Sequence, residues 1–281
     1  MTLRYLSGLL GMFAICFGVQ SIALRASGGK TVKSESNYFS SIARLQTESQ
    51  GKPQVMMLGS SLTGRLGDRA QHFDGVANLG CDGGSAVVTL RAMDNGTLPT
   101  APLLIIEANS LSFELEHRGK EIGEAIDSRW FGVGIKTPSL GATARPTAFA
   151  YSWLMARSSG NSAPTDMEFL PIDTQPGIQD PSSAPDLDAK EAAVVDEVAA
   201  ILGRLRKNGS DILLVMIPPG AKADSSQMRI PLALAAKSGI PWWDLTAGLP
   251  PDAVDYSDGL HLDAASAQKV MLTLMRQVGM K

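Results

Sequence analysis

The stretch Val55-Met56-Met57-Leu58-Gly59-Ser60-Ser61 decides the fold class of this chain. Its four apolar residues form a run of the length typical of a buried strand, and a turn of small residues follows at once. The chain after Ser61 is predicted to continue as a helix. A strand that passes through a tight turn into a helix is the unit by which an α/β sheet presents a side chain at its edge.

The same alternation recurs on both sides of this stretch. Short apolar strands are predicted at residues 76–79, 102–108, 211–217 and 240–245, and helices at 85–93, 188–207, 228–237 and 264–278. Strands that alternate with helices favour a largely parallel sheet covered by helices on both faces. The sequence therefore predicts a three-layer α/β domain.

Composition narrows the function classes. The chain has 281 residues, and its 25 basic and 28 acidic residues give a net charge of −3, which argues against nucleic-acid binding. This length fits one catalytic domain with appendages. The two cysteines, Cys16 and Cys81, allow no disulfide framework and no Cys/His metal site, so neither a metal nor another cofactor is expected.

The N-terminus is apolar enough to cross a membrane. No residue from Tyr5 to Leu24 is charged, and a helix of 20 residues would be about 30 Å long, close to the thickness of a bilayer core. Two interpretations remain open: an uncleaved anchor over residues 1–25, or a signal peptide cut after the small residues Ser21-Ile22-Ala23. The length of the run favours the anchor, and both interpretations place the rest of the chain outside the cytoplasm.

Three further regions follow from this division. Residues 26–50 are polar and are predicted to be a juxtamembrane linker, and residues 51–281 form the predicted catalytic domain. Within that domain, residues 111–187 break the alternation of strands and helices and are predicted to be an insertion. The part from 158 to 185, rich in Pro, Ser, Asp and Gly, is expected to be a long loop.

Polar residues with catalytic potential follow the predicted strands. Ser61, Gly83 and Asn109 each come after a strand, and Asp258 and His261 lie in the loop before the last helix. An acid three residues before a histidine can hold the imidazole from the same turn, and such a pair serves as orienter and base for a hydroxyl nucleophile. Because ligands gather at the carboxyl edge of a parallel sheet, we expect these residues to converge.

Taken in order, these segments resemble the sequence blocks of the SGNH/GDSL hydrolase family. Gly59-Ser60-Ser61-Leu62 is similar to the first block, residues 78–83 to the second, Asn109 to the third and Asp258-Gly259-Leu260-His261 to the last. The match runs through most of the exported region. It implies the flavodoxin-like SGNH hydrolase fold.

The resemblance also implies a role for each matching residue. Ser61 would be the nucleophile, His261 the base and Asp258 the orienting acid. The oxyanion hole would consist of the backbone N–H groups of Ser61 and Gly83 and the side-chain amide of Asn109.

The chain departs from the family pattern at two positions. Ser60 stands where most members have aspartate, and Glu107-Ala108-Asn109-Ser110 stands where Gly-x-Asn-Asp is usual. A carboxylate near an oxyanion site repels the developing charge, so Glu107 is expected to pair with an arginine or to cap backbone groups. Ser60 remains the alternative nucleophile to Ser61.

The first block, the leucine after His261 and the membrane segment together resemble the anchored branch of this superfamily, which includes the D-alanyl transfer protein of teichoic-acid modification. That resemblance implies a single-pass protein of the cytoplasmic membrane with its catalytic domain on the extracytoplasmic side. Its expected activity is acyl transfer to, or removal from, a cell-surface or secreted polysaccharide. Its expected partner is a multi-pass membrane O-acyltransferase or a glycan synthase. The alternative is a non-catalytic, membrane-tethered carbohydrate-binding or assembly component.

Overall fold

The computed structural model describes residues 2–28, 34–69, 73–158 and 168–280. Its strands are β1 (Val55–Gly59), β2 (Val76–Gly80), β3 (Leu103–Glu107), β4 (Gly177–Ile178), β5 (Asp211–Met216) and β6 (Pro241–Asp244). The α-helices are α1 (Thr2–Ala26), α2 (Asn37–Glu48), α3 (Ser61–Arg69), α4 (Ala86–Asp94), α5 (Lys120–Asp127), α6 (Arg129–Lys136), α7 (Pro146–Ser158), α8 (Ala189–Lys207), α9 (Ser226–Ser238) and α10 (Ala264–Gln277). Short 3-10 helices are η1 (Ala108–Glu116), η2 (Pro138–Leu140), η3 (Ala142–Ala144) and η4 (Pro181–Ser183).

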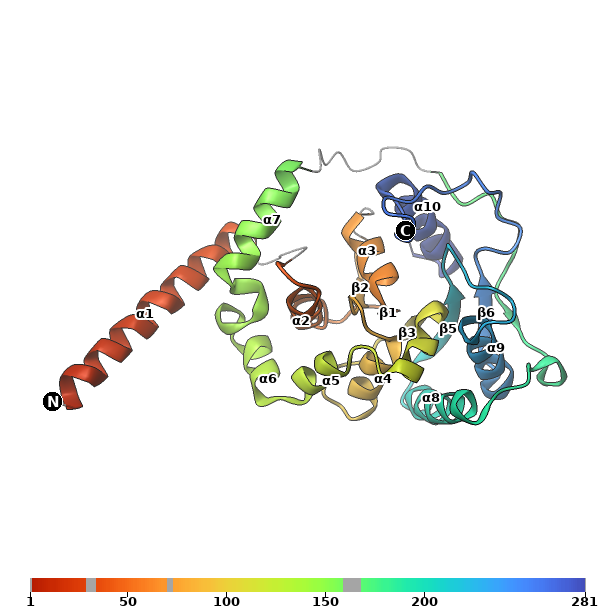
Figure 1. Ribbon diagram of the computed structural model, residues 1–281, viewed down its shortest axis with the longest axis horizontal. Helices are drawn as coiled ribbons and strands as arrows, with labels where there is room; N and C mark the ends of the chain where they lie inside the picture. Colours follow the sequence, from red (N-terminus) through yellow and green to blue (C-terminus); the bar gives the residue numbers. More distant parts are fainter. Residues whose placement is uncertain (1, 29–33, 70–72, 159–167, 281) are drawn as a thin grey trace.

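The strands form one sheet in the order β2-β1-β3-β5-β6-β4 (Figure 1). The first five are parallel, and only the two-residue edge strand β4 runs antiparallel. In the register, Gly59 of β1 lies beside Gly80 of β2, and Leu58 lies beside Ile106 of β3. The carboxyl ends of the three neighbouring strands therefore meet at one edge.

Helices cover both faces of this sheet. In Figure 1, α3 and α10 lie above it and α4 and α8 below it. Side chains that alternate along β1 enter two separate cores: Met56 and Leu58 pack with residues of α4, α8 and α9, while Val55 and Met57 pack with residues of α10. Both faces of the central strands are buried, which explains their continuous apolar sequences. The predicted α/β class, the largely parallel sheet and the predicted strands and helices are confirmed.

The structure differs from the sequence-based expectation in two regions. The stretch 26–50, expected to be a linker, contains α2, which begins after the N-cap residue Ser36 and packs against β2. The first half of the stretch 111–187 is helical, with α5, α6 and α7 connected through η2 and η3. Within the described part of the second half only β4 and η4 are regular, and residues 159–167 of the expected loop lie outside the described residues.

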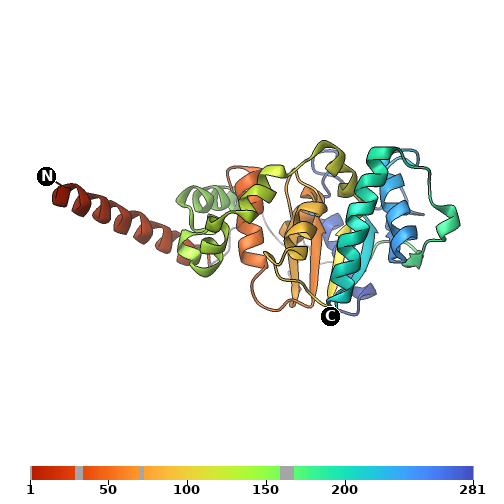
Figure 2. The same cartoon turned by 90° about the horizontal axis from the view of Figure 1, so that it is seen from below.

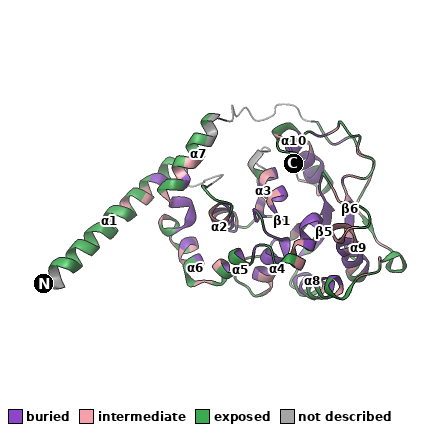
Figure 3. Cartoon of the chain, in the orientation of Figure 1, coloured by how far each residue is buried: buried purple, intermediate pink, exposed green. Residues whose placement is uncertain are grey.

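Helix α1 projects from the body of the molecule (Figures 1 and 2). Its segment Arg4–Ala26 is long and apolar enough to cross a membrane. Most of its side chains are exposed, as the green colouring in Figure 3 shows, and burial begins only where its last two turns reach η2, η3 and α7.

Candidate active site

Ser61 and His261 meet at the carboxyl edge of the sheet. Ser61 is the first residue of α3, directly after the β1 turn, and His261 lies in the loop that precedes α10. Packing of α10 against α3 brings the two together, so that His261 Nε2 lies 2.9 Å from Ser61 Oγ. The imidazole is buried.

Asp258 holds the other side of the imidazole. His261 Nδ1 lies 2.8 Å from Asp258 Oδ2 and 3.0 Å from Oδ1. With the proton on Nδ1 and directed at this carboxylate, Nε2 is left to accept a proton from the serine hydroxyl. Ser61, His261 and Asp258 thus form a continuous hydrogen-bonded series with the geometry of a nucleophile, a base and an orienting acid.

Backbone groups of its own loop also hold the Asp258 carboxylate in place. Asp258 Oδ1 accepts the backbone N–H of Leu260 at 3.2 Å and that of His261 at 2.8 Å. Gly259, which follows Asp258 in this turn, has a φ of +80°. The loop is closed by a hydrogen bond of 2.8 Å from Ser257 N–H to the His261 carbonyl. The backbone N–H of His261, followed by the imidazole and the other donors, lowers the pKa of Asp258 well below its usual range, so the carboxyl is ionised at neutral pH.

Arg65 is a further contact of Asp258, and sequence reasoning missed it. Its Nη1 lies 2.8 Å from Asp258 Oδ2, and both side chains are partly exposed. Arg65 follows Ser61 by four residues, so both lie on the same face of α3. That spacing was the available signal, because a helix that presents a nucleophile toward Asp258-His261 presents the residue one turn later to the same loop.

Glu107, the last residue of β3, lies beneath the turn that carries Ser61. Its side chain is 1% exposed and faces the start of α3. Oε2 accepts the backbone N–H groups of Ser60 at 2.9 Å and Thr63 at 3.0 Å, and it also accepts the Thr63 hydroxyl at 2.7 Å. The expectation that this carboxylate caps backbone groups is therefore met at the N-terminus of α3.

The side chains of the two adjacent serines point to different partners, and the Glu107 carboxylate is the partner of Ser60. Ser60 Oγ donates to Glu107 Oε1 at 2.7 Å and accepts the N–H of Leu62 at 3.2 Å, so the Ser60 hydroxyl points into the protein. The Ser61 hydroxyl instead faces His261. Of the two candidates, only Ser61 is in contact with His261.

Burial governs the protonation of Glu107. It raises the pKa of this carboxyl above its usual value, while the hydroxyl and N–H donors of Thr63 and Ser60 act in the opposite direction. All four donors point at the carboxylate oxygens, an arrangement that suits the ionised form.

Two glycines allow α3 to approach the sheet so closely. A Cβ on Gly59 would collide with the side chains of Thr63 and Glu107. A Cβ on Gly80 would lie 2.6 Å from Gly64 Cα and 2.8 Å from the Ser60 carbonyl oxygen. Both positions therefore require glycine for steric reasons, independent of their backbone angles.

The turn after β2 places Gly83 near the same edge. Gly83 has a φ of +78°, and a Cβ there would meet no atom within 4 Å, so its backbone is open to approach. The turn is anchored by α2: Arg44 Nη1 lies 3.2 Å from Asp82 Oδ1 and donates to the Gly80 carbonyl at 2.6 Å, and Ser41 Oγ accepts the Asp82 N–H at 2.8 Å. A buried ion pair from the expected linker thus fixes the turn that carries Gly83.

Asn109 connects the ends of β3 and β5. Its Nδ2 donates to the Ile217 carbonyl at 2.9 Å, and its Oδ1 accepts the Ile217 N–H at 2.8 Å. A primary amide carries two N–H groups, and this pairing uses one of them. Asn109 therefore joins two strand ends through hydrogen bonds to the Ile217 backbone, a role that the sequence did not predict.

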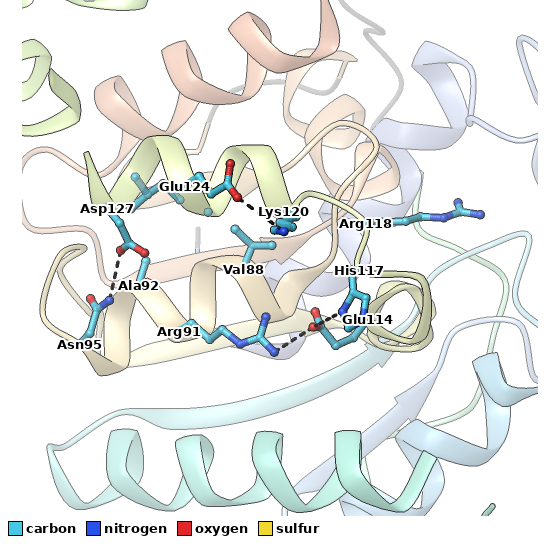
Figure 4. A pocket seen from close by; sticks show the side chains of 12 residues that line it. Val88, Arg91, Ala92, Asn95, Glu114, His117, Arg118, Lys120, Glu124 and Asp127 are labelled. Carbon is cyan, nitrogen blue, oxygen red and sulfur yellow. Dashed lines mark hydrogen bonds and ion pairs between the residues drawn. The ribbon is translucent and has the colours of Figure 1, made fainter. Parts of the chain in front are cut away.

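A cavity of about 370 Å³ lies between α4, η1 and α5 (Figure 4). It is lined by residues of both charges, among them Arg91, whose Nη2 lies 2.8 Å from Glu114 Oε1. None of the predicted site residues lines it. Within the described ranges, no cluster of three or more His, Cys, Asp or Glu side chains forms a metal site.

Comparisons of this chain with protein-family models, with curated proteins and with solved structures find no match. The assignment of function consequently rests on the geometry around Ser61 and His261.

Proposed function

We propose that this chain is a membrane-anchored SGNH-type serine esterase or O-acyltransferase that acts on a cell-surface or secreted polysaccharide. The observation that carries the proposal is the series from Ser61 Oγ through His261 to Asp258, with contacts of 2.9 Å and 2.8 Å. The order of the parallel strands, which is 2-1-3-4-5 when they alone are counted, supports the flavodoxin-like form of the sheet.

Acylation begins at Ser61. His261 Nε2 takes the hydroxyl proton as Ser61 Oγ bonds to the ester carbonyl carbon, and Asp258 stabilises the resulting imidazolium. When the tetrahedral intermediate collapses, the bond to the alcohol oxygen breaks and His261 returns the proton to that oxygen. The acyl group is left on Ser61.

The negative oxygen of the intermediate requires donors at the same edge. The backbone N–H groups of Ser61 and Gly83 and the second N–H of the Asn109 amide are the proposed donors. Each such donor contributes about two to three decades in rate in enzymes of this type.

Deacylation repeats these steps with a new acceptor. His261 removes a proton from the acceptor hydroxyl, whose oxygen attacks the acyl carbon, and Ser61 leaves with the proton. Water as acceptor makes the protein an esterase, and a sugar hydroxyl makes it an O-acyltransferase. We favour transfer, because the combination of these blocks with an N-terminal membrane helix resembles the anchored branch of the family.

We further propose that α1 is retained as a single-pass anchor, with the catalytic domain outside the cytoplasm. Contacts of its last turns with η2, η3 and α7 support retention, because cleavage in this region would remove a packed element. An N-terminal sequence of the mature protein that begins after Ala23 would contradict retention.

Labelling with a serine-directed fluorophosphonate tests the catalytic assignment. The wild-type chain should be labelled, and Ser61→Ala and His261→Ala should abolish or nearly abolish labelling. Ser182→Ala, at an exposed serine of η4, is the matched control and should be labelled like wild type. A folded wild-type chain that takes no label would favour the non-catalytic binding component.

Hydrolysis and transfer are separated by their products. The protein is incubated with an activated acetyl ester and candidate oligosaccharides, and free acetate and acetylated sugar are quantified. Acetate alone, with every acceptor tested, would rule out transfer.

A further inference from the structure

The last turns of α1 pack against protein although they belong to its apolar run. Ala23 is buried, and Gly18, Ser21 and Leu24 are partly buried. Their contacts are with η2, η3 and α7, and the Ser21 hydroxyl lies 3.1 Å from that of Ser139 in η2. This end of the helix is therefore enclosed on one side by the domain.

This packing shortens the freely projecting part of α1. The apolar run Tyr5–Leu24 has 20 residues, but only Tyr5–Phe17 precedes the packed turns. A helical segment of 13 residues is about 20 Å long, about 10 Å less than the hydrocarbon core of a bilayer. A membrane crossed by the whole run must therefore reach the level of η2 and α7.

The surface at this level is unusually apolar. Leu140 of η2 is 39% exposed, and Trp153 and Leu154 of α7 are 49% and 58% exposed. Ala150, Trp153, Leu154 and Arg157 follow the spacing i, i+3, i+4, i+7 and are all exposed, so they form one outward face of α7. The outward face of a helix on a soluble domain is normally polar, whereas Ala150, Trp153 and Leu154 make this one largely apolar.

The composition of this face fits the boundary between headgroups and acyl chains. Tryptophan is enriched at that depth because its ring is apolar and its N–H is polar. The Arg157 guanidinium lies 4.2 Å from the centroid of the Trp153 ring, an arrangement that keeps the charge beside the ring and available to lipid phosphates.

We propose that Leu140, Ala150, Trp153, Leu154 and Arg157, here termed the α7 surface, are immersed in the interfacial layer of the membrane that α1 crosses. The occupant of this surface is lipid. The inference rests on the anchor role proposed for α1 and is independent of the catalytic role of Ser61. Immersion accounts for the difference between the length of the projecting part of α1 and the thickness of the bilayer core. It also gives the domain a second attachment to the membrane, which fixes the orientation of the domain relative to the bilayer.

Quenching of tryptophan by brominated lipid tests this contact. The full chain is reconstituted in phosphatidylcholine vesicles whose acyl chains carry bromine near the headgroup, and its emission is compared with that in unbrominated vesicles. Of the four tryptophans, Trp242 and Trp243 are buried in the domain, so Trp130 and Trp153 are the accessible ones. In Trp130→Phe, Trp153 is the one accessible tryptophan and should be quenched by brominated lipid, and the further change Trp153→Phe should abolish that quenching.

A matched control is available away from α1. Phe169 is also exposed and lies against Arg276 of α10, a helix remote from α1 (Figures 1 and 2). In a background with both Trp130→Phe and Trp153→Phe, Phe169→Trp should show no quenching by brominated lipid. An unchanged urea-denaturation midpoint of each variant would show that the domain remains folded.

Two outcomes would overturn the inference, and they differ in what else they affect. Vesicle-bound protein whose Trp153 emission is not quenched would show that the α7 surface faces water or another protein, and the anchor would stand. Protein that does not float with the vesicles would remove the anchor and the α7 contact together. Neither outcome bears on labelling of Ser61.

Discussion

The carboxylate of Glu107 receives both the backbone N–H and the hydroxyl of Ser60, at 2.9 Å and 2.7 Å, directly beneath the first turn of α3. This pairing orients the two serines in opposite directions. The carboxylate is saturated by donors of the turn, which is how a buried acid is tolerated beside a site proposed to stabilise negative charge.

Truncation of Glu107 should destabilise the whole domain. Glu107→Ala leaves the N–H groups of Ser60 and Thr63 buried without an acceptor, and we expect a loss of about 2 to 3 kcal/mol in the free energy of unfolding. Glu107→Gln keeps an acceptor at the Oε2 position and should cost about 1 kcal/mol or less. Urea denaturation measures both. Equal midpoints for Glu107→Ala and wild type would contradict a capping role.

The pH dependence of stability should identify the buried acid. Because burial raises the pKa of Glu107 above its usual 4.5, the folded chain retains this proton to higher pH than the unfolded chain does. The contribution of Glu107 to stability is then full below pH 4.5 and is lost as pH rises through the folded pKa. Relative to Glu107→Gln, wild type should lose stability as pH rises from 4.5. A difference between the two that is constant with pH would refute this.

The pKa shift of Asp258 has the opposite sign, and so does its effect on stability. Its pKa is lowered in the folded chain, so its contribution to stability is present above the usual value of 3.8 and is lost as pH falls below it. Asp258→Asn should flatten the acid side of the stability profile. It should also slow fluorophosphonate labelling by about three to four decades, because an amide fails to hold the tautomer that leaves Nε2 free. Labelling within about tenfold of wild type would argue that Asp258 does not orient the base.

The region around Ser61 was predictable because each element carries a local signal. The apolar run before Gly59 predicts a buried strand, and the small residues after it predict a tight turn. Asp258 and His261 are three residues apart, so their contact is almost local. These features depend on few residues outside their own segments.

Other parts of the fold depend on contacts that sequence patterns do not encode. Helix α2 lies in the stretch 26–50, whose polar composition predicts a linker, yet its Arg44 and Gln46 are buried against distant backbone. Arg44 donates to the Gly80 carbonyl and Gln46 to that of Phe131. The pairing of Asn109 with Ile217 joins residues 108 positions apart. The short helices α5 and α6 lack the length at which periodicity becomes distinctive.

Arg65 should act by positioning and should have a small effect. Its contact with Asp258 is partly exposed, and pairs of this kind contribute about 0.2 to 1 kcal/mol. Arg65→Ala should therefore slow labelling by about two- to fivefold, with Arg65→Lys intermediate. Salt screens an exposed pair, so the difference between wild type and Arg65→Ala should shrink at high ionic strength. A salt-independent loss of a hundredfold would instead place Arg65 in contact with substrate.

Gly80 and Gly132 offer a matched test of close approach. Gly80→Ala places a Cβ against the Gly64 backbone and the Ser60 carbonyl, so α3 must move away from the sheet. We expect a loss of about 2 to 3 kcal/mol in the free energy of unfolding and slower labelling, because Ser61 moves with α3 relative to His261. Gly132 lies within α6, where a Cβ meets nothing within 4 Å, and Gly132→Ala should be neutral or stabilise by up to about 1 kcal/mol. Urea denaturation of both variants, with labelling rates measured below the transition, separates the steric effect at the turn that carries Ser61 from the general effect of replacing a glycine. Equal stability of the two variants would show that the approach of α3 to β2 does not depend on Gly80.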